Sequence, residues 1–358
     1  MRIAILSFYS GINQRGVERW VYDLASRLWV THEVTVFQNN PLGIRTNYSI
    51  RTSGINFNEG KTLSGWIARH LFIDYKSLKV LHFTLAILKT LFKENFDIVI
   101  PTDGGWEPAI VRIITWLRRK KMVVIGHAGI GWDDTNNLLC FPDTFVALSS
   151  YAKVWAEKTN PFVKTVYIPD GVDMKLFRPD GDKIDFGLKR PLLLCVSSLE
   201  KGKRVDLVIK AVSLLKNYNL LVCGRGTLER KIYKFGQKLL GKRFKLKSYD
   251  FDKMPLVYRS ADVLLSASLP SYSFEMVLVE AMASGLSVIA NNDPIRSEIV
   301  GKAGFLIDVR DTRRFSEVIG KVLQKQNAQG YSLHQAGRYS WDKILSEYVS
   351  LFERLQQS

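Results

Sequence analysis

Short apolar runs alternate with longer segments of helical periodicity along the whole chain. Residues 2–7 and 32–37 are apolar runs of strand length, and the apolar positions of residues 16–28 between them fall on one helical face. The alternation continues through strand-like runs at 97–101 and 122–127. This pattern predicts βαβ units, a parallel sheet and helices on both of its faces.

A polar segment rich in Gly, Pro and charge divides the chain at residues 178–190. A second alternation begins after it, so we predict an α/β fold with two doubly wound, Rossmann-like domains facing across a cleft. The predicted boundaries are 1–180 for the N-terminal domain, 181–190 for the linker, 191–338 for the C-terminal domain, and 339–358 for a last helix.

Length and composition fit a soluble protein with two cores. The chain has 358 residues, of which 46% are hydrophobic and 24% charged. We expect no secretory signal in the first residues and no transmembrane helix, because no uninterrupted apolar run reaches about 18–20 residues. Cys140, Cys195 and Cys223 are scattered without metal-ligand spacing. They favour a reducing, cytoplasmic location.

The net charge of +17 is unusual and favours an anionic partner. No nucleic-acid-binding motif accompanies the charge, so we expect no nucleic acid partner. Residues 61–93, including Lys61, mix Lys and Arg with large apolar side chains, and residues 118–121 form a basic cluster. We hypothesise that they attach the protein peripherally to an anionic membrane surface. The alternative is that residues 61–93 are ordinary crossover helices.

The segment SYSFEMVLVEAMASG, residues 271–285, carries the strongest chemical signal. It predicts a loop that enters a helix near Ser273, with Gly285 after the end of the helix. The backbone N–H groups and positive dipole at such a helix start suit a phosphate. Glu280 would lie one to two turns inside, within reach of a ribose. An ordinary amphipathic helix is the alternative interpretation.

Two other loops of the second half could serve the same ligand. Lys203 and Arg204 follow a strand and precede a helix, where a cation would neutralise a diphosphate. Gly224 and Gly226 end another strand, and they would line a nucleotide or simply form a tight turn.

The segment resembles the Glu-x7-Glu region of retaining glycosyltransferases of the GT-B fold, family 4, through the run Glu280-Ala-Met-Ala-Ser-Gly285. The resemblance extends in order through most of the chain. It departs at Tyr272, where the family has its first Glu, and at Glu275, where the family usually has Gly. It implies that Lys203 contacts the donor diphosphate and that Glu280 contacts the ribose. The expected donor-binding residues also include Gly16, Arg204, Gly224, Gly226, Tyr272, Ser273, Phe274, Glu275, Met276 and Val277.

The same resemblance implies roles in the N-terminal half. Gly16 opens a helix after a glycine-containing loop, and the family has a His near the reacting sugar where His127 stands. Asp103, Trp106, Trp132 and Asp133 are candidates for the acceptor side, although a plain polar loop is the better explanation for Asp103 and Trp106. The expected catalytic residues are thus His127, Lys203, Glu275 and Glu280.

The resemblance implies a retaining glycosyltransferase without a cofactor, and we expect no metal because no Asp-x-Asp motif appears where a metal-dependent transferase would need it. It would move a sugar from a UDP- or GDP-linked donor to a glycan or lipid-linked acceptor. Tyr272 leaves two hypotheses open: an altered donor sugar reached by Glu275, or a weak or inactive enzyme that still binds nucleotide. The alternatives are a non-catalytic nucleotide-sugar or glycan-binding subunit and a GT-B sugar-nucleotide epimerase.

Overall fold

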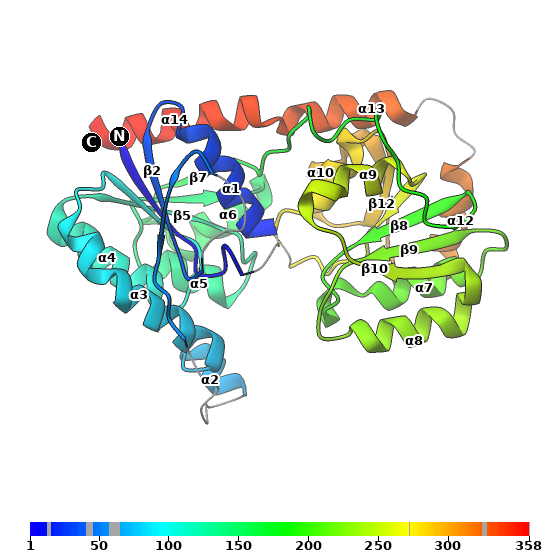
Figure 1. The fold of residues 1–358 in the computed structure, drawn as a ribbon, viewed down its shortest axis with the longest axis horizontal. Helices are drawn as coiled ribbons and strands as arrows, with labels where there is room; N and C mark the ends of the chain where they lie inside the picture. The colour runs from blue at the N-terminus through cyan, green and yellow to red at the C-terminus, as the bar shows by residue number, and fades with distance from the viewer. Residues whose placement is uncertain (13–15, 41–45, 57–64, 272, 324–327, 358) are drawn as a thin grey trace. The chain divides into compact units, whose positions relative to one another are not determined.

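The chain folds into two α/β units (Figure 1). The computed structural model describes residues 1–12, 16–40, 46–56, 65–271, 273–323 and 328–357. Unit 1 comprises Met1–Pro169 together with Ile344–Ser358, and unit 2 comprises Asp170–Lys343.

The predicted linker packs on unit 2. The Ile184 N–H donates a 2.7 Å hydrogen bond to Ser260 Oγ, and Arg259 Nε donates a 2.8 Å bond to the carbonyl of Asp182. These bonds explain why residues 170–190 group with unit 2.

Unit 1 is built on a parallel sheet in which the strands run in the order β3-β2-β1-β4-β5-β6-β7. Chain order runs outward from β1 in both directions, which is the arrangement of a doubly wound sheet. The strands are β1 (Arg2–Leu6), β2 (Glu33–Gln38), β3 (Ser49–Thr52), β4 (Ile98–Pro101), β5 (Lys121–Ile125), β6 (Thr144–Ala147) and β7 (Thr165–Tyr167).

Apolar helix faces cover this sheet. The helices of unit 1 are α1 (Gly16–Leu28), α2 (Trp66–His70), α3 (Tyr75–Lys93), α4 (Trp106–Arg118), α5 (Trp132–Leu139), α6 (Ser150–Thr159) and, from Ile344 onward, α14 (Trp341–Gln357). Phe83 of α3 and Val111 of α4 pack into one core with Leu6 and Val124 of the sheet. Trp20 of α1 instead packs edge-on against Tyr348 of α14, with ring centroids 6.0 Å apart.

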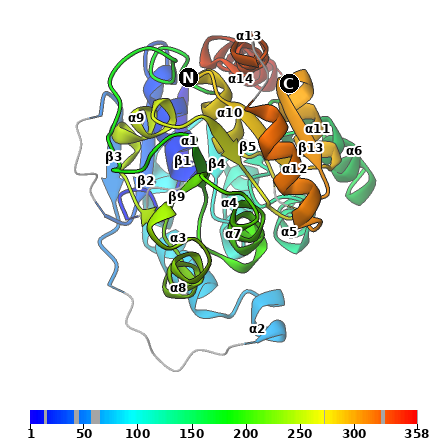
Figure 2. The same cartoon turned by 90° about the vertical axis from the view of Figure 1, so that its right-hand side faces the viewer.

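The helical segment considered within residues 61–93 forms two helices in its described part. Phe72 has a φ of 54°, which ends the first helix because a left-handed residue cannot continue it. Asp74 then caps α3 by accepting hydrogen bonds from the N–H groups of Lys76 and Ser77. The result is the short helix α2, which lies at the periphery of the ribbon in both views (Figures 1 and 2).

Unit 2 is built on a second parallel sheet with the strand order β10-β9-β8-β11-β12-β13. Its strands are β8 (Leu192–Val196), β9 (Asn219–Cys223), β10 (Phe244–Lys247), β11 (Val263–Leu265), β12 (Ser287–Asn291) and β13 (Gly304–Ile307). Its helices are α7 (Val205–Ser213), α8 (Glu229–Leu240), α9 (Met254–Arg259), α10 (Met276–Ala283), α11 (Pro294–Val300), α12 (Thr312–Val322) and α13 (Ala328–Ala336). Helices α7 and α8 lie on one face of the sheet, and α9 and α10 lie on the other (Figure 1).

The prediction of two doubly wound, Rossmann-like domains is therefore confirmed. The cleft expected between them stays a prediction. Within the described ranges, no helix combines the length and the apolar content needed to cross a bilayer.

Candidate functional site

The start of α10 lies three residues later than the sequence predicted. The helix begins at Met276, because Glu275 has extended backbone angles, φ −105° and ψ 90°. Ser273 and Phe274 belong to the preceding loop, where the Phe274 ring packs against Tyr339 with centroids 5.4 Å apart. The N–H groups that open the helix are thus those of Met276 and Val277. Tyr272, the departure from the family pattern, lies outside the described residues.

Glu275 is buried at this helix start and accepts hydrogen bonds on both carboxylate oxygens. Its Oε1 lies 3.2 Å from Lys203 Nζ, and its Oε2 lies 3.1 Å from Ser266 Oγ and 3.2 Å from Arg296 Nε. Burial alone would raise the pKa of Glu275, but the charges of Lys203 and Arg296 outweigh it and lower the pKa to about 2. Glu275 is therefore ionised, and its expected contact with sugar hydroxyls stays a prediction.

Sequence reasoning missed Arg296, which is fully buried in α11. Arg296 also lies 3.2 Å from Asp293, the residue that caps α11. A buried Arg needs a carboxylate partner, and Glu275, which is buried in the loop before α10, provides one for Arg296. The one sequence signal was Glu275 itself, an acidic residue within an otherwise apolar stripe.

Lys203 and Arg204 are adjacent but make different contacts. Lys203 ends a short 3₁₀ turn, Lys201–Lys203, and carries its ammonium to the start of α10. Arg204 has a φ of 48°, and its Nε and Nη2 donate to the carbonyls of Ala267 and Ser268 at 2.6 and 2.8 Å. Lys203 thus supplies the charge beside α10, whereas Arg204 ties down the loop after β11.

Glu280 is buried one turn inside α10. Its Oε2 accepts a 2.6 Å hydrogen bond from the hydroxyl of Tyr258 in α9. Burial, followed by the Glu280 charge, raises the pKa of Tyr258 well above its ordinary value, so the phenol stays protonated as the donor. The bond fixes the Glu280 carboxylate, which is the expected ribose ligand.

Gly224 and Gly226 are explained by backbone packing. A Cβ on Gly224 would lie 1.8 Å from the Ser197 carbonyl oxygen, and one on Gly226 would lie 2.6 Å from that of Leu199. The loops after β8 and β9 therefore touch through backbone, which supports the tight-turn interpretation. Their expected contact with a nucleotide stays a prediction.

Gly16 and His127 belong to unit 1. Gly16 is the first residue of α1, and a Cβ there would meet no atom of the described residues within 4 Å. His127 follows β5 by two residues, and its ring packs edge-on against Trp20 at 4.8 Å. Burial lowers the pKa of His127 to about 3, so the ring is neutral. Its Nε2 is enclosed without a hydrogen-bond partner among the described residues.

The expected acceptor-side residues divide into two groups. Asp103 accepts a 2.6 Å hydrogen bond from the Phe8 N–H after β1, and burial and then the charge of Glu18 raise its pKa to about 7. Trp106, Trp132 and Asp133 all contact the segment Arg69–Phe72. Trp106 Nε1 donates to the Phe72 carbonyl at 3.2 Å and Trp132 Nε1 to that of His70 at 3.1 Å. Asp133 Oδ2 lies 3.6 Å from Arg69 Nη2.

Trp106 does not lie in a plain polar loop, because it opens α4, and Trp132 and Asp133 open α5. The contacts of both tryptophans hold the short helix α2 against unit 1. Among the described residues, no group of three or more His, Cys, Asp or Glu side chains is placed to hold a metal ion.

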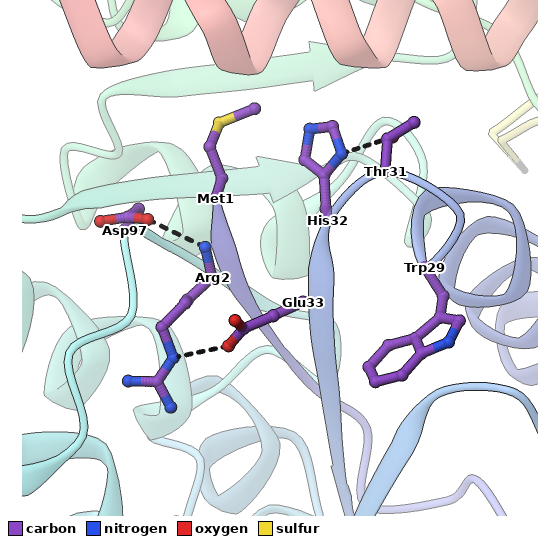
Figure 3. Close-up of a pocket in the computed structure, with 7 residues that line it drawn as sticks. All are labelled: Met1, Arg2, Trp29, Thr31, His32, Glu33 and Asp97. Carbon is purple, nitrogen blue, oxygen red and sulfur yellow. Dashed lines mark hydrogen bonds and ion pairs between the residues drawn. The ribbon is translucent and has the colours of Figure 1, made fainter.

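A hollow in unit 1 lies at the amino ends of its strands (Figure 3). It is lined by Met1, Arg2, Trp29, Thr31, His32, Glu33 and Asp97. The Arg2 N–H donates to Asp97 at 2.9 Å, and Arg2 Nε donates to Glu33 at 3.2 Å. Parallel α/β sheets bind ligands at the carboxyl ends of their strands. This hollow flanks the amino ends of β1 and β2, so we do not assign it to the site.

Residues 179–340 match the family model described as Glycosyl transferases group 1. The phosphatidyl-myo-inositol mannosyltransferase of Mycolicibacterium smegmatis is 28% identical over 220 residues, which cover 58% of this chain and 56% of that protein. The chain thus spans just over half the length of this relative.

Two solved structures share the fold over nearly the whole chain. Sucrose-phosphate synthase from Thermosynechococcus elongatus has a TM-score of 0.81 at 19% identity and covers 99% of both chains. Anabaena HepE in complex with UDP and glucose has a TM-score of 0.76 at 15% identity and also covers 99% of both chains.

Proposed function

We propose that this chain is a group 1 glycosyltransferase of the GT-B fold and transfers a sugar from a nucleoside-diphosphate sugar to a glycan or lipid-linked acceptor, because residues 179–340 match that family model and the fold is shared with sucrose-phosphate synthase. The donor would be UDP- or GDP-linked. We also propose retention of anomeric configuration, on the resemblance of residues 271–285 to a retaining family, and activity without a metal ion or cofactor.

The observation that carries this proposal is the position of Lys203 Nζ, 3.2 Å from the residue that precedes α10. A cation and the N-terminus of a helix meet there, and both stabilise the negative charge of a leaving diphosphate. The bond between the sugar C1 and the phosphate oxygen breaks, and its electron pair stays with the diphosphate. The acceptor hydroxyl oxygen bonds to C1 and passes its proton to the diphosphate.

The other site residues take supporting roles in this proposal. Glu280, held by Tyr258, accepts hydrogen bonds from the ribose hydroxyls. His127 is neutral and can donate or accept one hydrogen bond to the sugar. Asp103, with its raised pKa, is proposed for the acceptor side.

Titration calorimetry and a turnover assay test this function. Purified protein is titrated with UDP and GDP in the presence of EDTA, and donor conjugates of the nucleotide that binds are then assayed for transfer and slow hydrolysis. Selective binding of one nucleotide in EDTA, together with transfer or slow hydrolysis of one of its sugar conjugates, supports the proposal. Binding without turnover, even with acceptor extracts, would favour the non-catalytic subunit. Conversion of the donor without an acceptor would indicate an epimerase, and activity restored only by a divalent cation would refute metal independence.

We further propose that unit 1 binds an anionic membrane surface, which suits the lipid-linked acceptor that the mannosyltransferase relative's name indicates. Trp116 and Leu117 of α4 are 58% and 69% exposed, and Phe92 of α3 is 45% exposed. The Arg118 guanidinium lies over the Phe92 ring, 5.5 Å from its centroid. Lys89, Lys93 and Arg119 are also exposed. This arrangement of aromatic, aliphatic and basic side chains fits an interface between water and anionic lipid. Lys61 lies outside the described residues.

Co-sedimentation with phosphatidylglycerol vesicles at low salt tests this surface. The variant W116A/L117A should bind more weakly, whereas L214A, which removes an exposed leucine from unit 2, should bind like the wild type. Equal binding by all three proteins, or no preference for anionic over neutral vesicles, would refute this part of the proposal.

A further inference from the structure

Several donors converge on the carboxylate of Glu275. The ammonium of Lys203, the hydroxyl of Ser266 and the guanidinium of Arg296 lie within 3.2 Å of a Glu275 oxygen, and the Ser268 side chain also hydrogen-bonds to it. Glu275 is also the residue that precedes α10, so a helix N-terminus adds its positive end. This is the constellation expected of an anion site, and a side chain of the protein itself already occupies it.

The two cations hold Glu275 unequally. Arg296 is fully buried and is anchored on its other side by Asp293 at 3.2 Å. The Lys203 side chain remains 18% exposed and ends in a single flexible ammonium. The contact between Lys203 and Glu275 is therefore the one that can exchange, while Arg296 keeps the carboxylate in place.

We propose that Glu275 is a built-in competitor for the donor diphosphate. Donor binding moves Lys203 from the Glu275 carboxylate to a phosphate oxygen, and Lys203 returns to Glu275 when the nucleoside diphosphate leaves. This inference rests on the proposed function, because it assigns Lys203 to the diphosphate. It gives Glu275 a role in tuning nucleotide affinity and product release, in place of contact with the transferred sugar.

A double-mutant cycle tests the competition. The proteins are wild type, E275Q, K203Q and the double variant E275Q/K203Q, each titrated with UDP and with GDP. We expect E275Q to bind the preferred nucleotide about tenfold more tightly, because Lys203 then no longer leaves a carboxylate in order to reach the phosphate. K203Q should bind more weakly, and E275Q should bring no gain in the K203Q background. In the turnover assay, E275Q should also have a lower KM for the donor.

Unchanged or weaker binding by E275Q would overturn the inference. An equal gain in both Lys203 backgrounds would also overturn it, since the gain would then not involve that ammonium. E275Q leaves Arg296 with Asp293 as its remaining carboxylate partner, so its thermal melting is recorded in parallel. If E275Q does not fold, E275Q/R296M removes both buried partners and takes its place in the cycle.

The outcomes separate this inference from the function on which it rests. Nucleotide binding and sugar transfer by the wild type without a gain in E275Q would reject the competitor and leave the glycosyltransferase proposal standing. Failure of all variants and the wild type to bind UDP or GDP would reject both.

Discussion

The hydroxyl of Tyr258 donates a 2.6 Å hydrogen bond to Oε2 of Glu280, and both side chains are buried. The bond joins α9 to α10 across 22 positions of the sequence. It holds an ionisable side chain of the proposed donor site in one orientation. A carboxylate fixed before the ligand arrives loses less conformational entropy on binding, which favours affinity.

Tyr258→Phe should therefore weaken donor binding and stability together. A hydrogen bond to a charged group contributes roughly 1.5–3 kcal/mol, and its loss leaves Glu280 buried with one donor fewer. We expect a higher KM for the donor, a smaller change in kcat and a lower Tm. Tyr233→Phe, which changes a half-exposed tyrosine of α8, is the matched control and should change neither. An unchanged KM in Tyr258→Phe would show that Glu280 needs no positioning.

Lys203→Met and Arg204→Met should differ although the two residues are neighbours. Lys203→Met removes the cation proposed for the diphosphate, so UDP or GDP should bind at least several-fold more weakly, with a modest change in Tm. Arg204→Met removes two hydrogen bonds to the carbonyls of Ala267 and Ser268, so its main effect should be a lower Tm. Calorimetry and thermal melting of both variants check this. If Arg204→Met instead loses nucleotide affinity at an unchanged Tm, and Lys203→Met does not, Arg204 rather than Lys203 contacts the diphosphate.

Gly224→Ala should be strongly destabilising. The new Cβ would lie 1.8 Å from the Ser197 carbonyl oxygen, and backbone atoms cannot yield as a flexible side chain can. Gly16→Ala provides a matched control, because its Cβ would meet no atom of the described residues within 4 Å. We expect urea unfolding to show a loss of about 3 kcal/mol or more for Gly224→Ala and little change for Gly16→Ala. If Gly16→Ala keeps its stability but loses donor affinity, the resemblance-based role of Gly16 gains support.

Asp170→Asn should stabilise the protein at alkaline pH. Burial raises the pKa of Asp170 to about 7, so the folded state holds the proton more tightly than the unfolded chain does. Below pH about 4 both states are protonated, and the wild type is not penalised. As pH rises to 7 and beyond, the wild type loses roughly 2–4 kcal/mol that Asp170→Asn does not lose. The Tm gain of Asp170→Asn should therefore grow between pH 4.5 and 8.

The exposed control Asp252→Asn should show no comparable trend. A Tm gain of Asp170→Asn that is the same at both ends of the pH range would show that Asp170 does not titrate between them.

The sequence predicted those parts of the fold that local patterns determine. Apolar runs of strand length marked β1, β5 and β9, and Gly285 marked the end of α10, where it has a φ of 82°. The start of α10 was misplaced, because a Ser-Tyr-Ser run suits a helix start while the backbone of Glu275 is extended. Nothing local shows that Phe72 interrupts a helix, since the cause is a single left-handed residue.

The candidate site was also predicted only where local patterns mark its residues. Lys203 and Glu280 are flagged by their loop and helix positions. Arg296 lies 21 residues from Glu275, and only the fold brings the two together. Pairing between distant residues of opposite charge has no periodicity in one sequence, so that network could not be predicted.

Unit 1 is interrupted in the chain, whereas unit 2 is one continuous segment, Asp170–Lys343. Trp20 packs edge-on against Tyr348 of α14 as well as against His127, and Tyr348 follows unit 2 in the chain. Unit 1 is therefore completed only after unit 2 has been synthesised. Unit 2 can close first, with the bridge between Val172 and Ser340 joining its two ends. Until all of unit 2 has been translated, the Trp20 side chain of α1 lacks the Tyr348 ring that packs against it in the folded unit.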